Sequence, residues 1–171
     1  KTAYDLIFQH LGQAGYEPVC IVSDGNGSIL SLVEERNIPH QRCIFHLLQD
    51  LKRWLTKGGE FVYGSDHILY SRIKWIFKTK RIEDLPFRLD LFRSISFVFE
   101  RRKSILEWFW EVLPNAVLHL SYIENPPPRT TTRLENLNGQ IKARIKTMRG
   151  IKSEKSLHNL LKILFHFRKC K

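Results

Sequence analysis

Acidic residues are scarce in the last quarter of this chain. Residues 129–171 hold twelve of the 28 Lys and Arg residues but only two of the 17 Asp and Glu residues, Glu135 and Glu154. The net charge of +11 therefore belongs almost entirely to this segment, and residues 1–128 are nearly neutral. Positive charge concentrated in this way is typical of a protein with a polyanion partner, most often nucleic acid. A solvated basic surface, an acidic protein partner and a membrane surface are the alternatives.

Long apolar runs and a secretory signal peptide are also missing. No apolar run approaches the roughly 18 residues that a membrane-spanning helix needs, and the N-terminus lacks the pattern of a signal peptide. Hydrophobic residues nevertheless make up 43% of the 171 positions, with four Trp and eleven Phe, which excludes a disordered chain. We expect one soluble globular domain without a membrane partner.

Cysteine and methionine are rare. The three cysteines, Cys20, Cys43 and Cys170, are odd in number and far apart, which excludes a disulfide framework and favours free thiols in a reducing compartment. We therefore expect a cytoplasmic protein, associated with the nucleoid if it is bacterial. The chain begins at Lys1 without an initiator methionine, and we expect it to be a piece of a longer protein.

The first third of the chain alternates between helix and strand patterns. The sequence predicts a helix over 2–14, a buried strand in "PVCIVSDGNG" that ends at Asp24, a helix over 28–37, a strand over 43–45, and a helix over 47–59 closed by Gly58 and Gly59. This order predicts an α/β fold with at least two parallel strands.

Residues 60–125 have helical periodicity without the alternation of strands. They end at "NPPPR", where three prolines prevent a helix. The segment contains Trp75, Trp108 and Trp110, which we interpret as core residues, with stacking on an unpaired nucleic-acid base as the alternative. We therefore predict an all-helical insertion.

After the prolines comes "RTTTRLENLNGQIKARIKTMRG", which predicts an amphipathic helix that stops at Gly150. Its apolar positions, expected to be buried, are Leu134, Leu137, Ile141, Ile145 and Met148. One flank of this stripe carries Glu135, Asn138, Lys142, Lys146 and Arg149, and the other carries Arg133 and Arg144. We predict that these polar and basic residues other than Glu135 bind the backbone of DNA.

The single acid in this basic stretch, Glu135, has two interpretations. With Thr132 three residues earlier it matches a capping box, in which both side chains satisfy the first turn of the helix. Alternatively it is a catalytic carboxylate that binds metal, which requires a second acid held at a rigid position.

Asp24 is the candidate for that second acid. It stands at the carboxyl end of a predicted strand, where open α/β sheets bind their ligands, and small residues follow it. The alternative is an Asp that serves only to form the turn in "SDGNG".

Three segments in this order, "IVSDGNGSI", "HQRCIFHLLQDL" and "TTTRLENLNGQIKARIKTMRG", resemble the DDE transposases of the Mutator-type and related bacterial insertion-sequence families. The resemblance implies a ribonuclease-H-like core formed by residues 1–59 and 126–171, incomplete at its N-terminus, with 60–125 as the all-helical insertion. It implies that Asp24 and Glu135 are the second and third catalytic acids, and that Asn138 follows the catalytic Glu as in the family. It also matches Cys43 and His46 to the family's Cys-x-x-His motif.

The family's first catalytic Asp lies on an earlier strand, and nothing before Asp24 fits it, since Asp5 falls inside the first predicted helix. With that missing Asp, the resemblance implies two Mg²⁺ or Mn²⁺ ions, about 4 Å apart, that assist cleavage and strand transfer. Carboxylates suit such hard cations. DNA, as transposon ends and target, would be the partner, and a homo-oligomer of the full-length protein stays open.

Cys43 and His46 also allow a zinc site, which would have to recruit His40, His10 or Cys20 without any regular spacing. We favour a core position for Cys43, and for His46 a contact with phosphate or with the active site. For the whole chain, the alternatives to a transposase are a catalytically inactive DNA-binding relic and a ribonuclease-H-like nuclease of another kind.

Overall fold

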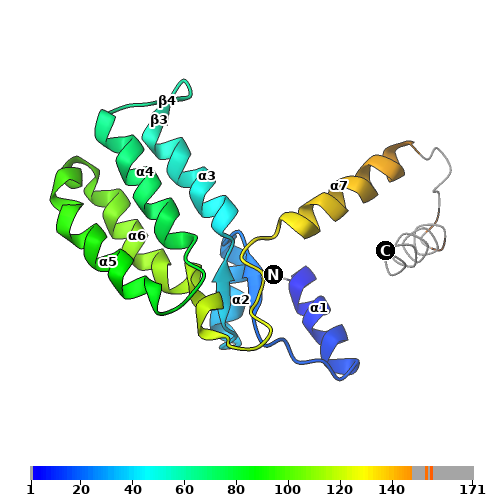
Figure 1. The fold of residues 1–171 in the computed structure, drawn as a ribbon. Coiled ribbons are helices and arrows are strands. Elements are labelled where there is room, and N and C mark those ends of the chain that lie inside the picture. The colour runs from blue at the N-terminus through cyan, green and yellow to red at the C-terminus, as the bar shows by residue number, and fades with distance from the viewer. Residues whose placement is uncertain (1, 148–152, 154, 156–171) are drawn as a thin grey trace. The chain divides into compact units, whose positions relative to one another are not determined.

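The computed structural model describes residues 2–147, 153 and 155 (Figure 1). In chain order the elements are α1 (Thr2–Gln13), β1 (Ile21–Ser23), α2 (Gly27–Glu35), β2 (His40–Arg42), α3 (Ile44–Leu55), β3 (Thr56–Lys57), β4 (Glu60–Phe61), α4 (Gly64–Phe77), α5 (Asp84–Ile95), the 3₁₀ helix η1 (Ser96–Arg102), α6 (Lys103–Ala116), the 3₁₀ helix η2 (Leu118–Ser121) and α7 (Thr132–Thr147). The described chain is thus a mostly helical α/β protein with one small parallel and one small antiparallel sheet.

Strands β1 and β2 form the parallel sheet, with Val22 opposite Gln41 and Ser23 opposite Arg42. Helix α2 connects them, as parallel strands require a crossover. The side chain of Asn26 begins this helix by accepting a hydrogen bond from the backbone N–H of Ser28 at 3.0 Å. The predicted strand ending at Asp24 and the helix after it are confirmed.

The second predicted strand was misplaced. Residues 43–45 do not form a strand, because Cys43 is the N-cap of α3 and the helix begins at Ile44. Ile44 continues the helical spacing of Leu47, Leu48 and Leu51, and all four side chains are buried in the same core. Because this stripe packs in the core, the apolar residues after Cys43 are helical. The second strand lies before them, at residues 40–42.

Gly58 and Gly59 do not close a helix, contrary to the prediction. They form the two-residue turn of the β3–β4 hairpin, in which Lys57 faces Glu60. Both glycines have positive φ angles, 64° and 93°, as the tightest hairpin turns require at their two central positions.

The hydrophobic core lies among the helices. It combines buried side chains from α3, α4, α5, η1 and α6, with the ring of Phe109 4.9 Å from Phe92 and 5.7 Å from Phe77. Trp75, Trp108 and Trp110 pack against this core, as predicted. Apart from β4, the regular elements of segment 60–125 are helices. Helix α3 packs in the same core, so these helices stabilise the element that follows the parallel sheet.

Gln41 joins the sheet to the helices. Its side chain is fully buried, and its Nε2 donates to the carbonyl oxygens of Arg42 at 2.7 Å and Ala116 at 2.8 Å. Its Oε1 accepts the backbone N–H of His119 at 2.8 Å. A buried polar group must be fully paired to be tolerated, so this amide fixes β2 against the end of α6.

By its contacts the chain divides into two units, Lys1–Thr131 and Thr132–Lys171. Helix α7 belongs to the second unit and matches the predicted helix up to Thr147. Of its predicted apolar stripe, the three positions whose burial is described are not buried, since Leu134 is 61% exposed and Leu137 and Ile141 are half-buried. The grouping of residues 126–171 with 1–59 in one core stays a prediction. Met148, Arg149 and Gly150 lie outside the described residues.

Among the residues that the structure describes, no helix combines the length and apolar character that crossing a bilayer demands.

Candidate functional site

Asp24 occupies the position that the sequence predicts. It follows β1 directly, at the carboxyl end of the parallel pair, and its side chain is exposed. Its Oδ1 accepts the backbone N–H of Asn26 at 3.2 Å, so Asp24 also forms the turn that leads into α2. The two interpretations of Asp24 are therefore compatible, because Oδ2 makes no hydrogen bond with any described residue.

Arg42, which the sequence analysis did not single out, covers the turn after Asp24. It leaves the end of β2, opposite Ser23, and donates from Nη2 to the backbone carbonyl of Asp24 at 3.1 Å. Gly25 makes this approach possible, since it has a φ of +87° and a Cβ there would lie 2.2 Å from the Cζ atom of Arg42. The guanidinium thus places a positive charge beside the candidate acid. The sequence signal that could have indicated this contact was the dipeptide "QR", which ends the second strand.

A buried pair lies beneath this turn. Ser23 Oγ is 2.8 Å from Nε2 of His40 and accepts the backbone N–H of Gly25 at 3.1 Å. Burial lowers the pKa of His40, the positive charge of Arg42 lowers it further, and Asp24 acts in the opposite direction. His40 is therefore neutral near pH 7, and its hydrogen bond with Ser23 helps to hold the turn.

Cys43 is fully buried, as expected of a core residue, but its sulfur is also a hydrogen-bond acceptor. Thr131 donates to Sγ from its backbone N and from Oγ1, both at 3.4 Å. Burial alone raises the pKa of Cys43, but the hydrogen bonds from Thr131 and His46 together outweigh it, and the pKa is lowered. Beside this contact, Ile44 donates its backbone N–H to the carbonyl of Arg129 at 2.9 Å. The Cys-x-x-His motif thereby holds the segment that follows the prolines.

His46 lies in the first turn of α3 and is half-buried. Its ring meets Phe45 edge-on, with 5.5 Å between the ring centroids. Its hydrogen bonds with Cys43 contribute to the lowered pKa of that thiol, and the predicted contact with phosphate or with the active site stays a prediction.

No three His, Cys, Asp or Glu side chains come together as a metal site in the part of the chain that the structure describes. Cys20 is half-buried, with its Sγ 3.6 Å from the carbonyl of Ile21, and burial raises its pKa. His10 is exposed on α1. The described residues therefore give the alternative zinc site no support.

Glu135 lies in the first turn of α7, in the second unit. The helix begins at Thr132 with Glu135 as the acidic residue of its first turn, and the Thr132–Glu135 capping box stays a prediction. Arg133, Asn138 and Lys142 are exposed on the same helix. Arg144 and Lys146 also belong to α7, whereas Arg149 lies outside the described residues.

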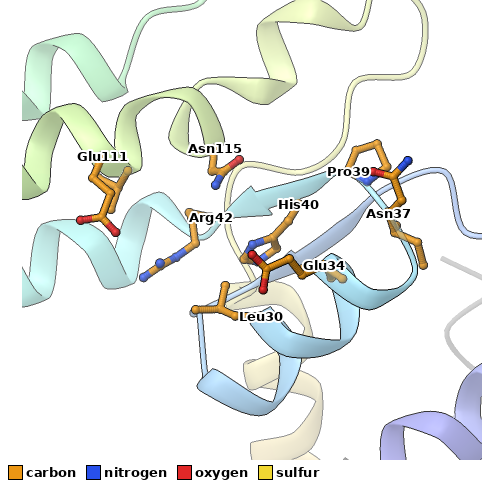
Figure 2. A pocket seen from close by; sticks show the side chains of 11 residues that line it. Leu30, Glu34, Asn37, Pro39, His40, Arg42, Glu111 and Asn115 are labelled. Carbon is orange, nitrogen blue, oxygen red and sulfur yellow. The ribbon is translucent and has the colours of Figure 1, made fainter.

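A hollow of about 710 Å³ opens beside Arg42 and His40. Figure 2 shows its walls: Leu30 and Glu34 come from α2, Asn37 and Pro39 from the turn before β2, and Glu111 and Asn115 from α6. Acids and bases both line it, so it lacks the single sign of charge that marks an ion site.

The chain matches no family model, and no curated protein and no solved structure is significantly similar to it.

Proposed function

We propose that this chain is part of the catalytic domain of a DNA transposase, which cleaves phosphodiester bonds and joins the freed end to target DNA. The observation that carries the proposal is the position of Asp24. It is an exposed carboxylate at the carboxyl end of a parallel strand, where α/β sheets place the groups that act on ligands. The helical character of 60–125 and the basic helix α7 with Glu135 in its first turn support the same function.

The proposal includes a ribonuclease-H-like core. Among the described residues, β1 pairs only with β2, so its other edge has no strand beside it. An edge of this kind can accept a further strand. We assign that place to a strand elsewhere in the full-length protein, and to that strand the first catalytic Asp.

Asp24 fits one ligand position of a Mg²⁺ or Mn²⁺ site, because carboxylate oxygens suit hard cations and Oδ2 is not engaged by a described residue. Glu135 and the first Asp would complete the ligands. Two such ions would activate the attacking oxygen, first of water and then of a 3′-hydroxyl, and neutralise charge on the leaving oxygen. Arg42 holds the backbone of Asp24 in place, and the cations of α7 would bind the neighbouring phosphates.

A non-catalytic DNA-binding module is the second candidate. It is favoured by one observation: the polar side chains Arg133, Asn138 and Lys142 of α7 are exposed, as binding to a phosphate backbone requires. Such a module would keep the cations of α7 and need neither acid.

Mn²⁺ binding tests the candidate ligand in the full-length protein, which would supply the first Asp. We expect added Mn²⁺ to broaden the NMR signals of Gly25 and Asn26, and Asp24→Asn to abolish the effect. Asp90→Asn is the matched control, since Asp90 is an exposed acid paired with Arg93 at 3.2 Å. Equal broadening in the wild type and in Asp24→Asn would exclude Asp24 as a ligand.

Catalysis is tested in the full-length protein. Asp24→Asn and Glu135→Gln should each abolish Mg²⁺-dependent cleavage and strand transfer, because both changes remove a metal-binding charge and preserve the side-chain shape. DNA affinity should be retained. Full cleavage by Glu135→Gln would contradict the transposase and leave the non-catalytic module as the better account.

A further inference from the structure

A second basic site lies in the first unit, formed by the end of α4, the start of α3 and the residues just before α7. A pocket of about 380 Å³ is lined by Ile44, Lys78, Lys80, Arg129 and Thr130. Three of these five residues are cationic and none is acidic. The volume corresponds to about a dozen water molecules at about 30 Å³ each, which leaves room for an anion with part of its hydration shell.

The two lysines are held on a fixed turn at the end of α4. Thr79, between them, is fully buried. Both its backbone N and its Oγ1 donate to the carbonyl of Ile76, at 3.0 Å and 2.5 Å. Because these two hydrogen bonds and its burial fix Thr79, the backbone on either side of it is also fixed. Lys78 and Lys80 lie on that backbone, and both side chains are exposed.

Arg129 and Thr130 reach the pocket on an equally fixed segment. The carbonyl of Arg129 accepts the backbone N–H of Ile44 at 2.9 Å. Two residues later, the backbone N of Thr131 donates a hydrogen bond to the sulfur of Cys43. The segment after the prolines is thus tied to the start of α3 at two points. A binding group on a fixed backbone loses less entropy when its ligand arrives.

The three cations are not neutralised by the neighbours that the structure describes. None of Lys78, Lys80 and Arg129 forms an ion pair with any described residue. By contrast, Arg81 is paired with Glu83 at 3.4 Å and Arg53 with Asp50 at 3.2 Å. Two ammonium groups, one guanidinium and the hydroxyl of Thr130 are donors suited to phosphate oxygens.

We propose that Lys78, Lys80, Arg129 and Thr130 form a binding site for a phosphate of the DNA backbone. The site rests on the proposed function for the identity of its partner. It adds to that function a contact in the first unit, in which Lys78 and Lys80, outside the basic segment 129–171, join Arg129 at its start.

Affinity for an unrelated 20-base-pair duplex, measured over a range of salt concentrations, tests the site. Each neutralised phosphate contributes about −0.9 to the slope of log affinity against log salt. The double variant Lys78→Ala/Lys80→Ala should therefore bind more weakly and with a slope shallower by about 1. Lys52→Ala/Lys57→Ala is the control, since it removes the same charge from exposed lysines outside the pocket. Equal behaviour of the two double variants would overturn the site.

NMR separates the possible sources of the phosphate. The duplex should shift the backbone amides of Thr79 and Thr130, and Arg129→Ala should reduce these shifts. If inorganic phosphate shifts the two amides and the duplex does not displace it, the pocket binds a small free anion and the proposal for DNA is wrong.

The two proposals can fail separately. Weaker duplex binding by Lys78→Ala/Lys80→Ala, together with full cleavage by Asp24→Asn in the full-length protein, would keep the phosphate site and reject the transposase. Loss of cleavage in Asp24→Asn, together with unchanged duplex binding by the lysine variant, would keep the transposase and reject the phosphate site.

Discussion

Thr131 donates two hydrogen bonds to the sulfur of Cys43, one from its backbone N and one from Oγ1, each 3.4 Å long. These residues are 88 positions apart, and the contact fixes the last residue before α7 against the first turn of α3. The sulfur is buried, so its acceptor bonds replace contacts with water. The Cys-x-x-His motif thus has a structural role in the described residues.

The first prediction concerns this contact. Thr131→Val removes only the hydroxyl bond, so it should cost about 1 kcal/mol of unfolding free energy and raise the pKa of Cys43. Denaturant unfolding and the pH dependence of the Cys43 Cβ chemical shift measure the two effects. Thr131→Ser, which keeps the hydroxyl, should lie near the wild type. An unchanged pKa in Thr131→Val would show that the hydroxyl does not stabilise the thiolate.

The lowered pKa of Cys43 also sets a pH dependence. The folded state releases the thiol proton at lower pH than the unfolded chain, whose cysteine pKa is about 8.5. The resulting stabilisation is complete above that value and is lost as the pH falls through the folded pKa. Cys43→Ala should remove this component from the pH dependence of the unfolding free energy.

The second prediction concerns acid stability. Burial is the largest influence on the pKa of both His40 and His119, and both values are lowered. Below about pH 6.5, the pKa of an unperturbed histidine, these two histidines bind protons in the unfolded chain before they do so in the folded chain. The unfolding free energy should therefore fall as the pH drops from 7 through the folded pKa values. His119→Gln should reduce this dependence, and His10→Gln on the exposed face of α1 should not. Equal profiles for the two variants would contradict the burial argument.

The third prediction concerns the buried ion pair of the helical core. Asp66 is 1% exposed, and Arg102 donates to it from Nε at 2.9 Å and from Nη2 at 2.5 Å. Arg102→Leu leaves a buried carboxylate without its partner and should cost about 3 kcal/mol. Arg81→Leu breaks the exposed pair with Glu83 and should cost no more than about 1 kcal/mol. Chemical denaturation measures both, and similar effects of the two variants would argue against a buried pair.

The fourth prediction concerns α7. Lys142→Ala/Lys146→Ala should weaken binding to unrelated DNA duplexes alike, because the binding of phosphates carries no sequence information. The slope of log affinity against log salt should become shallower by about 0.9 for each phosphate that is no longer neutralised. Lys52→Ala/Lys57→Ala again serves as the control of equal charge. A slope that matches this control would mean that this flank of α7 does not face DNA.

Much of the secondary structure could be predicted, because it depends on local spacing. Helices α1 and α2 correspond closely to the helical period in residues 2–14 and 28–37. Strand β1 corresponds to the predicted strand before the turn at Asp24. The misplaced second strand shows the limit of this reasoning. A short apolar run such as 43–45 suits a strand or a helix equally, and the burial of Ile44 with Leu47 and Leu48 decided for the helix.

The sequence by itself determined the concentration of charge in residues 129–171 and the place of Asp24 after a strand, since both follow from composition and local pattern. Only the tertiary structure decided which side chains surround that acid. Arg42 reaches Asp24 because the crossover through α2 sets Ser23 opposite Arg42, and Lys78, Lys80 and Arg129 meet because a helix end and a distant loop pack beside α3. Such contacts join residues far apart in the chain, and no local period encodes them.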